Sequence, residues 1–161
     1  MTSDPTRKQI LTLLGGHGAH MTFEEAVADF PDDAINAFPP NVTYTPWHLV
    51  EHLHLTQLDM LEYVTSADYP RRDWPADYWP ASEARATPAG WAASVQSFLA
   101  DLARLRELVA DPDRDLDAPI PWTSGHSLLR CVRIIADHNA YHVGEFAILR
   151  QVMGTWPPAH Q

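Results

Sequence analysis

The chain of 161 residues is poor in several features that mark particular classes of protein. It has one cysteine, Cys131, so neither an intrachain disulfide nor a cysteine-based zinc site can form. Its 11 lysines and arginines are outnumbered by 21 aspartates and glutamates, which leaves a net charge of -10 with histidine neutral. Because binding a phosphate backbone or an anionic bilayer needs a basic face, we expect no nucleic-acid partner and no membrane partner.

Long apolar runs are also missing. No stretch approaches the ~18 apolar residues that a membrane-spanning helix needs. Residues 1–9 are polar and lack the apolar core of a signal peptide. The cytoplasm is therefore the expected location. The length is that of one domain, and we expect residues 1–161 to form a single helical domain.

No segment alternates apolar and polar residues like a strand between turns, so the chain is predicted to be all-α. Residues 4–14, 23–30, 47–65, 89–110 and 127–153 have helical character. Thr-Pro pairs start the third and fourth of these stretches, Thr22 and Glu25 have the spacing of a capping box, and Gly154 stops the last. Three long helices and a split first helix predict a four-helix bundle.

The connection between the second and third helices of this bundle, residues 66–86, is long and rich in aromatic residues. It holds Tyr69, Trp74, Tyr78 and Trp79. Loops of this length without structure of their own are usually functional or disordered, and the aromatic residues favour function. They either plug the end of the bundle or line the mouth of a pocket, and the sequence leaves both alternatives open.

Three polar residues lie on the predicted buried face of the last helix. His138 and His142 are four residues apart, so they point the same way about one turn apart, and Glu145 follows three residues later. Burying such groups without partners costs about a few kcal/mol each. A divalent metal compensates for this cost, because imidazole and carboxylate are good ligands, whereas a hydrogen-bonded cluster or a solvated cleft is the alternative. The predicted apolar stripe around them comprises Leu128, Cys131, Ile134, Ile135, Leu149, Val152 and Met153, with Arg133, Asn139, Ala140 and Gln151 opposite.

A tightly held metal needs a third ligand from another helix. The second helix of the bundle offers His48, His52 and His54. His52 and His54 flank its apolar arc on opposite sides, and His48 is predicted to point towards solvent. Periodicity does not choose between His52 and His54. Glu51 and His54 have the Glu-x-x-His spacing of di-iron bundles, but the sequence has no second such motif.

Two motifs resemble the DinB/YfiT-like superfamily of four-helix-bundle metal proteins: residues 46–53 (PWHLVEHL) and 137–144 (DHNAYHVG). The resemblance spans most of the chain, including the Trp-Pro loop and the order of helices. In that family one histidine of the second helix and an H-x-x-x-H pair of the last helix bind a divalent metal. The resemblance thus implies His52, His138 and His142 as ligands. The expected ion is zinc or nickel, with iron or manganese as alternatives.

The resemblance also implies an activity. Some members use a low-molecular-weight thiol in transferase or isomerase reactions, which implies a metal-dependent thiol S-transferase in detoxification or stress response. It further implies a thiol cosubstrate, a small-molecule electrophile covered by residues 69–79, and a homodimer. Relatives often have glutamine where this chain has Glu145, which would serve as catalytic base, as support for a ligand or as a fourth ligand. A metal-dependent hydrolase and a non-catalytic bundle with a structural metal stay open as alternatives.

Overall fold

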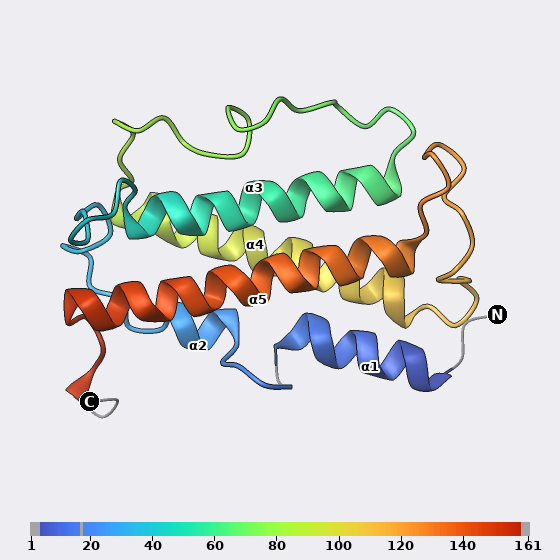
Figure 1. The fold of residues 1–161 in the computed structure, drawn as a ribbon, viewed down its shortest axis with the longest axis horizontal. Helices are drawn as coiled ribbons and strands as arrows, with labels where there is room; N and C mark the ends of the chain where they lie inside the picture. The colour runs from blue at the N-terminus through green and yellow to red at the C-terminus, as the bar shows by residue number, and fades with distance from the viewer. Residues whose placement is uncertain (1–3, 17, 159–161) are drawn as a thin grey trace.

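The computed structural model describes residues 4–16 and 18–158 and contains, within them, five helices and no strand (Figure 1). The all-α class predicted from the sequence is confirmed. The helices are α1 (Asp4–Gly15), α2 (Phe23–Val27), α3 (Pro46–Thr65), α4 (Pro88–Ala110) and α5 (Leu128–Met153).

The three long helices pack together, with both α4 and α5 against α3. The two short helices follow one another along the same side of α5, where α1 contacts α4 and α5 and α2 contacts α5 (Figure 1). The second stretch was predicted to be helical to residue 30, but α2 ends at Val27. It ends early because Ala28 leaves the helical conformation and Asp29 takes a positive φ of 51°, which the helix does not allow.

Local signals in the sequence fix where the long helices begin and end. The side chains of Thr45, Thr87 and Ser127 each accept a hydrogen bond from a backbone N–H of the first turn that follows them. Pro46 and Pro88 occupy the first helical position, where a missing N–H costs nothing. At the other end of α5, Gly154 adopts the left-handed conformation, with φ of 66°, that stops a helix.

The buried face of α5 is rotated relative to the face that periodicity predicted. Ile134 and Val152 were predicted to be buried but are 44% and 54% exposed, whereas Asn139, predicted on the opposite face, is only 9% exposed. Asn139 donates from Nδ2 to Oε1 of Gln57 over 2.7 Å, and Gln57 donates to the carbonyl of Phe98 over 2.6 Å. The amide is buried because α3 supplies its partner, and the pattern of α5 alone does not contain that information.

The aromatic loop, residues 66–86, runs back along α3 instead of across an end of the bundle (Figure 1). Asp59 of α3 anchors it, since its carboxylate accepts hydrogen bonds from Tyr69 over 2.9 Å, from Tyr78 over 3.0 Å and from Arg72 over 2.8 Å. Arg72 also donates to Glu62 over 2.6 Å. These contacts set the position of the residues that follow in the loop. None of the helices in the described part of the chain combines the length and the apolar character needed to cross a bilayer.

Candidate metal centre

Three histidines from two helices meet in the interior between α3 and α5. His52 lies in the second turn of α3, and His138 and His142 lie one turn apart near the middle of α5. One ring nitrogen of each lies within 4.8 Å of the others, and the Nε2 atoms of His52 and His138 are 3.2 Å apart. Among the described residues, no other group of three or more histidine, cysteine or acidic side chains brings its ligand atoms so close. The structure thus brings together the three residues that the family resemblance implies as ligands.

Two of these rings are held by a hydrogen bond on their outer nitrogen. His52 donates from Nδ1 to the carbonyl of Tyr78 over 2.7 Å, and His142 donates from Nδ1 to Oε2 of Glu145 over 2.5 Å. A carbonyl and a carboxylate can only accept, so each Nδ1 carries the proton. In the neutral form of each ring the lone pair then lies on Nε2, which is the arrangement that outer partners impose on histidines that bind metal.

Glu145 also has a second partner, because the hydroxyl of Tyr44 donates to its other oxygen, Oε1. Burial raises the pKa of Glu145, but the hydrogen bonds from His142 and Tyr44 outweigh that effect and hold its pKa below the usual value. Glu145 is thus an ionised carboxylate that orients His142, and its oxygens are not part of the group of gathered ligand atoms. Tyr44 was missed in the sequence because it lies 101 residues before Glu145 and outside any helix.

Two of the three histidines, His52 and His138, are electrically neutral near neutral pH. Burial lowers the pKa of His52 to about 4, although its hydrogen bond to Tyr78 acts in the opposite direction. Burial also lowers the pKa of His138 to about 4, and the nearby His142 and His52 add to that effect. A neutral imidazole is the form that binds a metal, so these two side chains need not lose a proton first.

The aromatic loop closes one side of this group. The indole of Trp79 lies flat on the ring of His52, with ring centroids 3.9 Å apart, and the ring of Tyr44 lies 5.5 Å from that of Trp79. Trp79 and Tyr44 also line a cavity of about 630 Å³. Of the two alternatives for the loop, the structure shows the one in which it lines a pocket. The remaining walls are Thr43, His48, Pro75, Ala76, Pro80, Ala81 and Ser82.

A family model described as the DinB superfamily matches residues 17–146 of this chain. The chain belongs to the DinB superfamily. The matched region contains the whole of α3 and most of α5, and with them all three gathered histidines. Comparison with curated proteins and with solved structures gave no match.

The donor set of this DinB-superfamily site can hold a divalent ion. Three imidazoles from two rigid helices are a ligand set that suits zinc, nickel and iron. His52 is 2% and His142 is 9% exposed, so the rings are largely removed from water. The hydrogen bonds on the outer nitrogens of these two rings complete the pattern expected around a bound metal.

The other two histidines of α3 lie outside this group. His48 was predicted to face solvent, but it is 2% exposed. Its Nδ1 accepts from the backbone N–H of Thr45 over 3.2 Å and its Nε2 donates to the carbonyl of Ala84 over 3.0 Å, so both nitrogens are used at the start of the helix. His54 faces α4 instead. It lies 3.9 Å from Asp101 of α4 and 3.4 Å from Glu51 of its own helix. The packing of α3 therefore selects His52.

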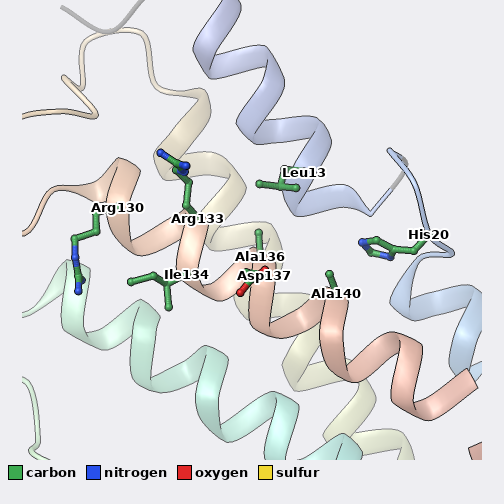
Figure 2. A pocket seen from close by; sticks show the side chains of 8 residues that line it. All are labelled: Leu13, His20, Arg130, Arg133, Ile134, Ala136, Asp137 and Ala140. Carbon is green, nitrogen blue, oxygen red and sulfur yellow. The ribbon is translucent and has the colours of Figure 1, made fainter. Parts of the chain in front are cut away.

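A second cavity, of about 570 Å³, lies between α1 and α5 (Figure 2). The gathered histidines are not among its lining residues, and neither is any residue of the aromatic loop. Its walls are Leu13 of α1, His20 of the following loop, and Arg130, Arg133, Ile134, Ala136, Asp137 and Ala140 of α5.

Proposed function

We propose that this protein is a divalent-metal-dependent enzyme that transfers a low-molecular-weight thiol to a small electrophile. The convergence of ring nitrogens from His52, His138 and His142 carries the proposal, together with a cavity of about 630 Å³ that shares Trp79 with His52. Three protein ligands are the pattern of catalytic sites, because a tetrahedral ion then keeps one position for another molecule. An ion bound there lowers the pKa of a thiol or water in that position.

The chain's own residues have defined roles in this proposal. Tyr78 and Glu145 orient His52 and His142 through their outer nitrogens, and Trp79 keeps water from one face of His52. Glu145 is already engaged by two donors, which favours positioning His142 over the role of base, although that role stays a prediction. In the transfer itself, the thiolate sulfur bonds to the electrophilic carbon, the leaving group departs with its electron pair, and the thiol proton passes to solvent.

The metal centre is tested first, by metal analysis of the untagged protein after incubation with zinc or nickel and removal of the excess. We expect roughly one ion per chain in the wild type. The His52→Ala variant should lose the ion, whereas His54→Ala, a change two residues away on the same helix, should retain it. Wild-type protein without metal, or full occupancy in His52→Ala, would overturn the site.

The reaction is tested with the metal-loaded protein, a panel of low-molecular-weight thiols and a chromogenic aryl halide. We expect turnover that needs both the thiol and the metal and that is lost in His52→Ala. Hydrolysis of an ester with no thiol present would show a hydrolase instead. Full metal occupancy with turnover in neither assay would show a structural metal.

A further inference from the structure

The cavity beside the histidines carries no charged side chain in its walls. Its nine lining residues include no lysine, arginine, aspartate or glutamate, although 20% of the whole chain is charged. Small apolar residues of the loop form much of the surface, and the aromatic rings of Tyr44 and Trp79 complete it, with the indole of Trp79 also packed on His52. The apolar wall residues are Pro75, Ala76, Pro80 and Ala81.

Two of the polar lining side chains, Tyr44 and His48, already make hydrogen bonds to protein partners. The hydroxyl of Tyr44 donates to Glu145, and both ring nitrogens of His48 are bonded to backbone groups of Thr45 and Ala84. Neither residue can therefore donate a hydrogen bond to an anion without giving up a bond that it already makes.

These walls favour an uncharged ligand over an anion of the same shape. An anion would give up its hydration and find no cation in the lining to compensate, in a protein whose net charge is already -10. An uncharged ring loses little on leaving water and gains contact with the faces of Trp79 and Tyr44.

We propose that this cavity binds the acceptor substrate and selects an uncharged, largely apolar small molecule over an anion. The word acceptor rests on the proposed transferase function, whereas the binding preference rests on the walls of the cavity alone. Trp79 lines the cavity and also packs on His52, so its indole is the wall that the cavity shares with the metal centre. Trp79, Tyr44 and Ala81 are then determinants of specificity.

The experiment compares 2-naphthylmethanol with 2-naphthoate, which share one ring system and differ in charge at neutral pH. Binding is measured by isothermal titration calorimetry on the zinc-loaded and on the metal-free protein. The variant Ala81→Trp places a large ring in the cavity wall, and Ala100→Trp makes the same change at an exposed position of α4. Circular dichroism and metal content verify that both variants fold.

We expect the alcohol to bind to the metal-free protein at least about tenfold more tightly than the carboxylate. Ala81→Trp should weaken alcohol binding by a similar factor in both forms, and Ala100→Trp should not. Equal affinity for both ligands in the metal-free protein, or alcohol binding unchanged in Ala81→Trp, would overturn the inference. If the alcohol binds as expected but the protein takes up no metal, the cavity assignment stands and the proposed function falls. If zinc binds and the alcohol does not, the cavity assignment falls and the proposed function stands.

Discussion

The indole of Trp79 lies flat on the imidazole of His52, with the two ring planes only 7° apart. The preceding residue, Tyr78, accepts the hydrogen bond from Nδ1 of the same histidine. Two consecutive loop residues therefore hold the imidazole of His52, one by stacking on its face and the other by a hydrogen bond to its edge. The path of the loop and the geometry of the metal centre are coupled for this reason.

Replacing Trp79 should weaken metal binding although the indole is not a ligand. We expect Trp79→Ala to lower zinc affinity roughly tenfold, because His52 loses its packing partner and gains access to water. Trp79→Phe, which keeps a flat ring, should lose less. Competition with a chromophoric zinc chelator measures the affinity. Trp74→Ala is the matched control, since Trp74 is 69% exposed and meets His52 only edge-on at 6.3 Å. Equal affinities for Trp79→Ala and the wild type would contradict the coupling.

Replacing Glu145 should separate positioning from proton transfer. Glu145→Ala removes the acceptor on Nδ1 of His142 and should lower zinc affinity by about 10- to 100-fold. Glu145→Gln keeps an oxygen that can accept this bond and should restore part of the affinity. Tyr44→Phe removes only the second donor to Glu145 and should have a smaller effect. Zinc affinity unchanged in Glu145→Ala together with lost turnover would indicate a base instead.

Removing the loop's anchor should free the loop and destabilise the fold. Asp59→Ala leaves Tyr69 and Tyr78 without their acceptor, which should lower the free energy of unfolding by about 1–3 kcal/mol. Urea denaturation measures this loss, and limited proteolysis within residues 66–86 should become faster. Asp68→Ala changes an exposed acidic residue of the same loop and serves as control. Unchanged stability and cleavage in Asp59→Ala would show that other contacts hold the loop.

The metal-free protein should lose stability on acidification between pH 6.5, the ordinary pKa of histidine, and the pKa of about 4 that His52 and His138 have in the fold. In that window the unfolded chain binds more protons at these residues than the folded chain does, so the free energy of unfolding falls as the pH falls. Each histidine contributes up to about 1.4 kcal/mol per pH unit there and nothing above it.

Urea denaturation across that pH range tests this expectation. The double variant His52→Gln/His138→Gln should show a shallower decline than the wild type, because glutamine does not titrate. Parallel declines in the two proteins would show that other groups cause the acid sensitivity.

Short local segments of the sequence determine where most of the helices begin and end. Thr-Pro pairs begin α3 and α4, and Gly154 ends α5, because caps act through backbone groups only a few residues away. The proximity of His138 and His142 also follows from the local sequence, since residues four positions apart on a helix lie about one turn apart on the same face. These features needed no knowledge of the rest of the molecule.

Relationships between elements were decided only by the tertiary structure. The rotation of α3 against α5 brings His52 to the pair and directs His54 to α4, and the same packing buries His48 and Asn139, which the pattern had assigned to solvent. The periodicity of a helix predicts which of its residues form the apolar face. Whether a polar residue at the edge of that face is buried depends on the hydrogen-bond partner that another element supplies.

The partners of the candidate ligands depend even more on tertiary structure. Tyr44 reaches Glu145 across 101 residues of chain, and the anchoring of the loop on Asp59 brings Trp79 onto His52. By itself, the sequence determined the helices and the histidine pair, because those follow from contacts within a few residues. The periodicity of the second bundle helix did not choose His52, which only the family resemblance implied. The placement of His52 beside the pair, the orienting groups and the cavity follow from contacts between distant segments, which exist only once the bundle has packed.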